Sequence, residues 1–251
     1  KKLNINSGDV IVASTGVIGM PFDVDVIVNG MDLLISKLSY EGGSSFEEGI
    51  MTTDTVLKEA AISFETGGKV VKIGACAKGS GMICPNMATM LCFVTTDACI
   101  DNKLLSKILK ETADETFNMV IVDGDTSTND MLSIMANGKS GVCITEANCG
   151  IFKEALFDVL KKLSKMIAKD GEGATKLLEC QVINAPDEIS AKLCVRSVIN
   201  SPLVKSAFFG ADANWGRILC ALGYSQADID VNKVDISFIS SKGEILLCKN
   251  G

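Results

Sequence analysis

"KEAAISFETGGKVVKIGACAKGSG", residues 58–81, joins two apolar arms across the short polar segment 66–68. Two arms of this kind separated by a pair of glycines are typical of a β-hairpin. The second arm continues into "KGSGMICPNMATML", residues 78–91, where a glycine-bearing stretch ends at Pro85–Asn86 and enters an apolar run. We therefore expect the hairpin to be followed by a loop and then by a buried strand within residues 89–98.

The rest of the chain mixes helical and strand patterns. Apolar residues at helical spacing predict helices over 25–40, 101–119, 152–169, the region after Pro186, and 212–225. Shorter β-rich runs predict strands at 9–15 and 49–54, a strand that turns into a helix start within 120–130, one strand after the loop at 171–176, and two closing strands. This alternation favours a layered α/β or α+β fold. The turn at 148–150 suggests two domains, residues 1–150 and 151–251.

Composition excludes several classes of protein. The chain has 251 residues, of which 47% are hydrophobic and 22% are charged, as in ordinary globular proteins. The net charge of −7 argues against a nucleic-acid partner, and no apolar run is long enough to cross a membrane. Ten cysteines without any C-x-x-C pair, in a chain without histidine, predict no zinc site. We expect buried free thiols, no bound metal and a cytoplasmic location.

Several short motifs allow a functional and a structural interpretation. "NGKS" at 137–140 and "GEGATK" at 171–176 each lack a glycine of a phosphate-binding loop, so both are interpreted as turns. "DGDTSTND" at 123–130 offers three carboxylates, but its spacing does not match a calcium loop, and a turn capped by its own side chains is favoured. Lys78 and Ser80 could form a Ser–Lys dyad, although a serine between glycines is usually a flexible polar residue.

Thr89 supports a more specific hypothesis. A threonine at the start of a strand is usually structural, and the chain contains no histidine that could act as its base. If the Ala88–Thr89 peptide bond is cut, however, Thr89 becomes a terminus that carries its own α-amine. Such an amine has a pKa of about 7.7–8.0, and a terminal threonine activated in this way is an established nucleophile. The glycine-bearing loop before Thr89 would supply the slack that such a cleavage needs.

The order of the motifs resembles the ornithine acetyltransferases, also called glutamate N-acetyltransferases. The matching stretches are "ASTGVIG" (13–19), "TTD" (52–54), "AKGSGMICPNMATML" (77–91), "DGDTSTND" (123–130), "GEGATK" (171–176) and "AFFGADANWGRIL" (207–219). Each motif is weak alone, but together they are specific and cover nearly the whole chain. Members of the family are longer at both ends, so the chain is expected to be a central portion. The family's C-terminal substrate-binding asparagine and hydroxyl residue would then lie beyond Gly251.

The resemblance implies an α+β fold, a layered αββα sandwich of the kind found in self-processing aminopeptidases. It implies autocatalytic cleavage between Ala88 and Thr89 into α and β subunits that stay together and pair into a heterotetramer. Thr89 would take the acetyl group from N-acetylornithine as an acetyl-threonine and pass it to glutamate in a ping-pong cycle of arginine biosynthesis. No cofactor is implied, and acetyl-CoA is a second candidate donor.

The resemblance also assigns roles to individual residues. Thr15, through its hydroxyl, and Gly16, through its backbone N–H, match the family's oxyanion hole. Substrate contacts carry over to Thr52, Lys78, Thr89 and Glu172. A lysine and a glutamate suit the carboxylate and ammonium ends of an amino acid.

Two other functions remain open. An amidase or aminopeptidase of the same architecture would use Thr89 and the oxyanion hole but pass the acyl group to water. A non-catalytic remnant would bind an acylated amino acid or serve as a subunit scaffold.

Overall fold

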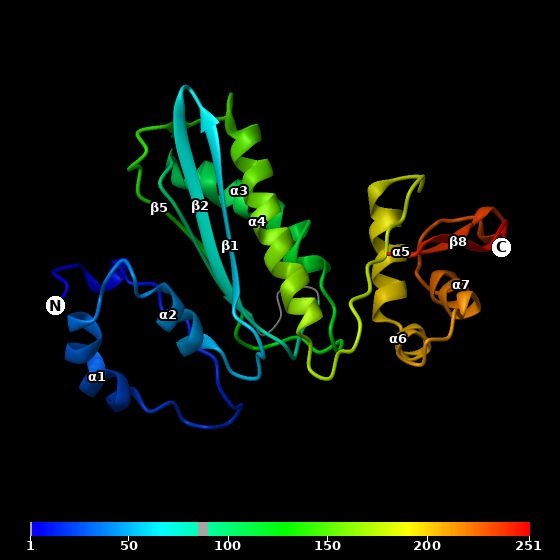
Figure 1. Ribbon diagram of the computed structural model, residues 1–251, viewed down its shortest axis with the longest axis horizontal. Coiled ribbons are helices and arrows are strands. Elements are labelled where there is room, and N and C mark those ends of the chain that lie inside the picture. Colours follow the sequence, from blue (N-terminus) through cyan, green and yellow to red (C-terminus); the bar gives the residue numbers. More distant parts are fainter. Residues whose placement is uncertain (1, 85–89) are drawn as a thin grey trace. The chain divides into compact units, whose positions relative to one another are not determined.

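A computed structural model describes residues 2–84 and 90–251 of the chain (Figure 1). The chain forms two compact units, residues 1–172 and 173–251. The division falls after Glu172, and not at the expected boundary near residue 150, because helix α4 (Cys149–Lys169) packs on the strands of the N-terminal unit. Residues 151–172 therefore belong with the sheet that precedes them.

The predicted hairpin is the start of the main sheet. Strands β1 (Lys58–Thr66) and β2 (Lys69–Lys78) pair antiparallel, with Thr66 opposite Lys69. The two connecting residues, Gly67 and Gly68, have φ angles of +59° and +74°. Positive φ at both central positions is the geometry of a two-residue hairpin turn, and it is easily reached only by residues such as glycine. The sequence prediction is confirmed here.

Two further strands extend this sheet. Strand β3 (Leu91–Thr96) pairs antiparallel with β2, and β5 (Met131–Ala136) pairs parallel with β3, giving the order β1-β2-β3-β5. The buried strand expected within 89–98 is confirmed over residues 91–96. The parallel pair β3–β5 needs a long crossover, and helix α3 (Asn102–Asp114) lies within it. The crossover also contains β4 (Cys99–Ile100) and the 3₁₀ turn η2 (Phe117–Met119).

One prediction for the segment before β5 is wrong. Residues 120–130 contain neither a strand nor the start of a helix. The carboxylates of Asp123 and Asp130 accept hydrogen bonds from amides about forty residues earlier in the chain. The side chains of this segment therefore bond to a distant part of the chain, and the segment itself stays irregular.

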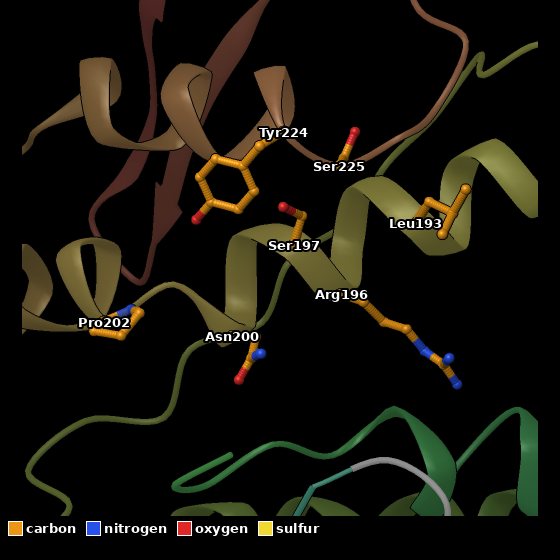
Figure 2. A pocket seen from close by; sticks show the side chains of 7 residues that line it. All are labelled: Leu193, Arg196, Ser197, Asn200, Pro202, Tyr224 and Ser225. Atoms are coloured by element: carbon orange, nitrogen blue, oxygen red, sulfur yellow. The ribbon is translucent and has the colours of Figure 1, made fainter.

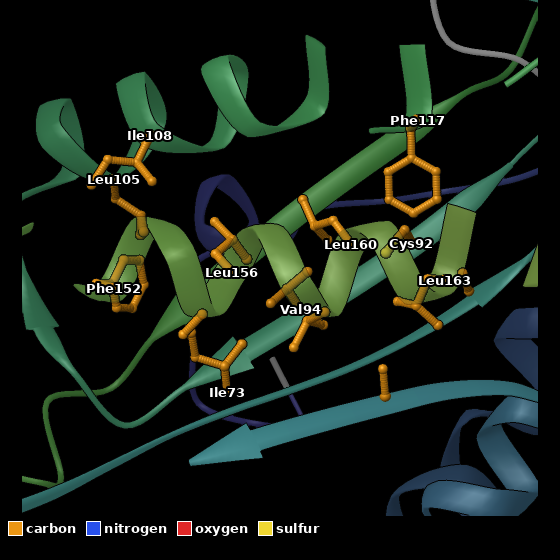
Figure 3. Close-up of a cluster of buried hydrophobic side chains, with 14 of the residues drawn as sticks. Ile73, Cys92, Val94, Leu105, Ile108, Phe117, Phe152, Leu156, Leu160 and Leu163 are labelled. Carbon is orange, nitrogen blue, oxygen red and sulfur yellow. The ribbon is translucent and has the colours of Figure 1, made fainter. Parts of the chain in front are cut away.

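Helix α4 covers one face of the sheet, and α3 packs against α4 (Figure 3). Along α4, Leu156, Leu160 and Leu163 are fully buried, as their helical spacing predicts. Ile73 and Val94 reach this layer from the strands, while Leu105 and Ile108 reach it from α3 (Figure 3). Each buried leucine contributes about 1.5–3 kcal/mol relative to an exposed one, so this layer is the core of the unit. A short strand, β6 (Cys143–Ile144), pairs with β4 just before α4.

The first part of the chain differs from expectation. It contains the 3₁₀ turn η1 (Ser7–Asp9), helix α1 (Val24–Ser36) and helix α2 (Gly43–Ile50). The helix predicted within 25–40 is confirmed as α1, whereas the strands predicted at 9–15 and 49–54 are wrong. Residues 10–15 pair with no strand in the described part of the chain. Residues 49–50 end α2, and the Thr52 amide donates to the side chain of Asp54 instead of joining a sheet.

The C-terminal unit packs three helices around a small core of its own. These are α5 (Glu188–Asn200), α6 (Pro202–Phe209) and α7 (Trp215–Gly223). Side chains of Asp187, Ser201 and Asn214 cap the three helix starts. The 3₁₀ turn η3 (Val231–Lys233) leads to an antiparallel hairpin of β7 (Ile236–Ser240) and β8 (Gly243–Cys248).

The helices and closing strands predicted for this unit are confirmed, while the strand predicted after residue 176 is absent, since residues 174–183 are irregular. A helix-covered sheet in one unit and helices beside a hairpin in the other make the fold α+β, as expected. The second stacked sheet of an αββα sandwich stays a prediction. No helix in the described residues is long and apolar enough to span a bilayer.

The ten cysteines are all free thiols. Cys92, Cys194 and Cys248 are buried, as their apolar neighbours predict, whereas Cys143 and Cys220 are exposed, against expectation. Burial raises the pKa of the Cys76 thiol to about 11, with smaller contributions from Glu47 and Glu59. Cys76 is therefore an unreactive thiol at neutral pH.

Candidate functional site

A buried lysine lies at the end of strand β2. Lys78 is the last residue of that strand and is 1% exposed. Its Nζ lies 3.4 Å from the hydroxyl oxygen of Thr52, in the irregular segment between α2 and β1. Among the described residues, no carboxylate lies within ion-pair distance of this ammonium. A buried ammonium with spare donors is suited to bind an anionic group of a ligand.

The surroundings of Lys78 affect its protonation in opposite directions. Burial lowers the pKa of Lys78 below its ordinary value, while the negative charges of Asp54 and Asp130 act to raise it. The nearby ammonium of Lys58 adds to the lowering. The pKa of Lys78 is lowered on balance, so the group loses its proton more easily than an exposed lysine does.

Glu172 meets the loop that follows Lys78. It comes three residues after the end of α4, and its backbone N–H donates to the carbonyl oxygen of Ser80 at 2.8 Å. Its exposed side chain lies directly over Gly81. Thr52, Lys78 and Glu172 thus come from three distant segments and gather around residues 78–81. The positions of these three residues in the sequence do not predict that they lie near the same loop, because only the tertiary fold brings them together.

The other predicted site residues lie elsewhere. Ala88 and Thr89 are outside the described residues, so the predicted cleavage point and nucleophile stay predictions. Thr15 and Gly16 lie in the irregular segment between η1 and α1. In the part of the chain that the structure describes, no hydrogen bond connects either of them to Lys78 or Glu172. Their role in an oxyanion hole also stays a prediction.

Three charged residues that sequence reasoning missed lie beside Lys78. Asp54, Lys58 and Asp170 form an ionic group, here called the buried charge cluster, whose side chains are 0%, 0% and 6% exposed. Lys58 Nζ lies 2.6 Å from Asp54 Oδ1 and 2.6 Å from Asp170 Oδ2. The available signal was a lysine in the alternating register of Ala60, Ile62 and Phe64, four residues after an aspartate.

The hydrogen bonds of the buried charge cluster lower the pKa values of both carboxyl groups. Burial acts to raise the pKa of Asp54, but hydrogen bonds from Lys58, Gly79 and Thr52 outweigh it. Burial likewise acts to raise the pKa of Asp170, and hydrogen bonds from Lys58 and Thr55 outweigh it. Both carboxylates are therefore ionised at neutral pH.

Ser80 is not the flexible polar residue that its glycine neighbours suggest. It is 2% exposed, and its hydroxyl lies 2.6 Å from that of Thr53. Gly79, between Lys78 and Ser80, has a φ of +149°, a backbone conformation that other residues rarely adopt. Residues 78–80 are therefore a fixed part of the site.

The acidic segment 123–130 holds the chain on both sides of residues 85–89. Asp123 accepts hydrogen bonds from the amides of Met82 (2.6 Å) and Ile83 (3.0 Å), and Asp130 accepts one from Met90 (3.1 Å). Within the segment, the Asp125 amide donates to Asp123 and the Asn129 amide donates to Ser127, each at 3.0 Å, so the interpretation as a turn capped by its own side chains is confirmed. No group of three or more acidic or cysteine side chains among the described residues is placed to hold a metal ion.

Two surface hollows have linings that do not include the site residues. One, of about 440 Å³, is in the C-terminal unit, where Arg196 and Ser197 of α5 and Tyr224 after α7 lie along it (Figure 2). The other, of about 810 Å³, borders the sheet face that carries Phe93, which is in edge-on contact with Phe46 of α2. Neither is lined by Lys78, Thr52 or Glu172.

The fold and the site define an α+β protein with a buried cation at the end of a mixed sheet, a hydroxyl next to that cation, and a carboxylate over the loop that follows. The family is shown by comparison with known proteins, because the ArgJ family model matches residues 1–251. The chain belongs to the ArgJ family.

Curated relatives agree with this assignment. The chain is 51% identical over 252 residues to a protein of Caldanaerobacter subterraneus named arginine biosynthesis bifunctional protein ArgJ. It is 50% identical over 253 residues to a Methanocaldococcus jannaschii protein named glutamate N-acetyltransferase. Each match includes 99% of this chain but only 62% of the relative, so the chain spans about three fifths of their length.

A solved structure supports the fold. The crystal structure of an arginine biosynthesis bifunctional protein ArgJ from Bacillus halodurans matches with a TM-score of 0.56 and 46% identity. The match covers 57% of this chain and 68% of that one. The predicted family and α+β class are thereby confirmed.

Proposed function

We propose that this chain is part of a glutamate N-acetyltransferase that moves an acetyl group from N-acetylornithine to glutamate in arginine biosynthesis. The observation that carries the proposal is the meeting of Thr52, Lys78 and Glu172 around the end of β2. Membership of the ArgJ family supports it independently. Since the relatives are longer, the activity is proposed for the whole protein that contains this chain.

The chemistry begins with cleavage of the Ala88–Thr89 peptide bond. The Thr89 α-amine then takes the proton of the Thr89 hydroxyl, whose oxygen attacks the acetyl carbonyl of N-acetylornithine. Thr15 and Gly16 stabilise the resulting oxyanion, the α-ammonium of Thr89 gives its proton to the departing amine of ornithine, and an acetyl-threonine remains. Glutamate attacks this ester through its amine, which releases N-acetylglutamate and restores the threonine. Because ornithine leaves before glutamate reacts with the acetyl-threonine, the kinetics are ping-pong.

The described residues suit the amino-acid part of both substrates. Lys78 binds the substrate carboxylate, because a buried ammonium pairs strongly with an anion. The Thr52 hydroxyl, 3.4 Å from Lys78 Nζ, can donate to or accept from the same group. Glu172 is exposed at the edge of the site and pairs with the ammonium end of ornithine.

Incubation with N-acetylornithine, with and without glutamate, tests the proposal. Formation of N-acetylglutamate and ornithine, with parallel lines in double-reciprocal plots, is the expected result. Acetate released without N-acetylglutamate would show an amidase or aminopeptidase instead. An uncut chain that is inert in both assays would indicate a non-catalytic remnant.

Intact mass under denaturing conditions tests the cleavage separately. We expect two pieces, residues 1–88 and 89–251, with Thr89 as a new amino terminus. The Thr89→Ala variant should stay in one piece and form no acetyl-enzyme. Thr89→Ser keeps a hydroxyl, so it should cleave and turn over weakly.

The remaining proposals concern donors, partners and location. The two pieces stay together as α and β subunits and pair into a heterotetramer, which sedimentation of the cleaved protein can test. The enzyme needs no cofactor, and acetyl-CoA serves as a second donor if label from it reaches N-acetylglutamate. The proposed location is the cytoplasm, and the proposal includes no nucleic-acid or membrane partner.

A further inference from the structure

The buried charge cluster is an unusual feature for the end of a sheet. Asp54, Lys58 and Asp170 carry two negative charges and one positive charge, and all three are nearly closed to solvent. Replacing buried ions by apolar side chains is often neutral or even stabilising, because burial removes their hydration. A gain in stability therefore does not by itself account for three charges at this position. Their directional hydrogen bonds point to another role.

Asp54 connects two of the predicted substrate residues. Its Oδ2 accepts the backbone N–H of Thr52 at 3.2 Å, and its Oδ1 accepts that of Gly79 at 2.6 Å. Gly79 directly follows Lys78, so one carboxylate fixes the backbone on both sides of the contact between Lys78 and Thr52. Lys58 Nζ also donates to Oδ1 of this carboxylate, at 2.6 Å.

Asp170 connects the cluster to the third substrate residue. It accepts hydrogen bonds from the amide of Thr55, at 2.9 Å, and from the Thr55 hydroxyl. Two residues later, the Glu172 amide donates to the Ser80 carbonyl. The segments 52–55, 78–80 and 170–172 are therefore connected by one continuous set of hydrogen bonds that passes through Lys58.

The charge of the cluster also acts on the site. Two carboxylates and one ammonium leave one net negative charge beside Lys78. Asp54 raises the pKa of Lys78 and so partly offsets the effect of burial, while Lys58 lowers this pKa by a smaller amount. Within the cluster, Asp54 therefore favours the ammonium form, which a substrate carboxylate requires.

We propose that the buried charge cluster is a positioning device that sets the spacing and charge of the three described substrate residues for an acylated amino acid. This inference rests on the proposed function. The members of the cluster do not contact the substrate. They act through the residues that do, so they are positioning residues.

The Asp54→Asn variant tests the inference in the active enzyme. Asparagine keeps an oxygen that can accept the Gly79 amide, but it removes the negative charge. The KM for N-acetylornithine should rise about tenfold while kcat falls less than about threefold, because substrate binding is affected and Thr89 is untouched. A fall in kcat with KM unchanged would overturn the inference.

A second measurement does not depend on turnover. Competitive labelling of Lys78 with acetic anhydride across a pH series, read by peptide mass spectrometry, reports where Lys78 loses its proton. In Asp54→Asn the midpoint should move to lower pH, since a raising influence is gone. An unchanged midpoint would overturn the inference even if the enzyme proves to be an amidase.

The proposed function can fail separately. A wild-type enzyme that forms no N-acetylglutamate contradicts the proposed function, and the labelling of Lys78 then still tests whether the cluster acts on Lys78.

Two further variants distinguish a specific effect of the cluster from a general loss of structure. Thr55→Val removes only the hydroxyl contact with Asp170 at an exposed position, so the fold should persist while KM rises about threefold. Glu111→Gln breaks an exposed ion pair with Lys153 and should change neither KM nor the labelling of Lys78. If Asp54→Asn does not fold and Thr55→Val leaves KM unchanged, the cluster is a structural element only.

Discussion

Glu172 lies so close to Gly81 that no side chain fits between them. A Cβ added to Gly81 would stand 2.7 Å from Oε1 of Glu172, closer than real Cβ contacts. The obstacle is the far end of a flexible side chain, so the fold can adjust by moving the carboxylate. A methyl group at residue 81 would therefore change the position of a predicted substrate residue without disturbing the core.

The Gly81→Ala variant should lose substrate affinity and keep its stability. We expect the KM for N-acetylornithine to rise about tenfold, equivalent to about 1.4 kcal/mol, because Glu172 is displaced from its position. The thermal unfolding midpoint should barely move. Gly74→Ala is the matched control, since a Cβ there meets only Thr95 Oγ1 at 3.9 Å, an ordinary contact. Equal KM values for the two variants would contradict a binding role for Glu172.

The buried charge cluster predicts how stability depends on acid. The folded-state pKa values of Asp54 and Asp170 lie below the ordinary value of 3.8. A carboxyl group with a lowered folded pKa contributes stability above its unfolded pKa, and this contribution is lost as the pH falls through the folded value. Urea unfolding should therefore show a free energy that declines below about pH 4 as these two groups take up protons.

The Lys58→Met variant should reverse that dependence. Without the ammonium, two carboxylates are buried together, and burial raises their pKa above the unfolded value. We expect a loss of about 3–5 kcal/mol at pH 7, with part of the stability recovered on mild acidification. Lys153→Met, in a partly exposed ion pair, should show a small loss and no reversal. A Lys58→Met protein that only weakens further in acid would refute this electrostatic account.

From the lowered pKa of Lys78, we predict that substrate binding weakens at alkaline pH. Burial lowers its pKa below 10.5, so the ammonium is lost at a pH where exposed lysines remain charged. The KM for N-acetylornithine should rise with pH before 10.5 is reached, while Lys78→Gln should raise KM at neutral pH and remove that rise. Lys72→Gln, at an exposed position of the same strand, serves as the control. The same pH profile in wild type and Lys78→Gln would exclude Lys78 as the titrating group.

From the hydrogen bonds of Asp123, we predict that this carboxylate affects the cleavage between Ala88 and Thr89. Asp123→Ala leaves the amides of Met82 and Ile83 without their acceptor, which should cost about 1–3 kcal/mol. Looser anchoring before residue 85 should also slow the appearance of the piece that begins at Thr89, followed by intact mass over time. Asp125→Ala, in the same loop, should process at the normal rate. Normal cleavage in Asp123→Ala would show that this anchor is not needed.

Local patterns in the sequence were sufficient for much of the fold. The hairpin at 58–78 follows from two apolar arms and a Gly-Gly turn, and α4 follows from leucines at helical spacing. These elements depend on interactions between near neighbours in the chain, so their own residues predict them. The order of short motifs was likewise sufficient to identify the family, which the family model confirms.

Failures of the sequence prediction occurred where polar side chains bind distant segments. Residues 120–130 looked like a strand and a helix start, but Asp123 and Asp130 hold amides of residues 82–90 instead. The boundary between the two units lies after residue 172, and not near residue 150 as predicted, because α4 packs on a sheet formed by earlier residues. In both cases, the deciding partner is far away in the sequence, and no local propensity reports it.

The sequence by itself determined the family, the α+β class and the identity of the candidate substrate residues. Only the tertiary structure decided that Thr52, Lys78 and Glu172 meet, and that Asp54, Lys58 and Asp170 connect them out of contact with water. The physical reason is that the interactions of a charged side chain depend on its burial and on the groups that lie next to it. Burial and partners are properties of the folded chain, whereas periodicity and motifs are properties of the chain alone.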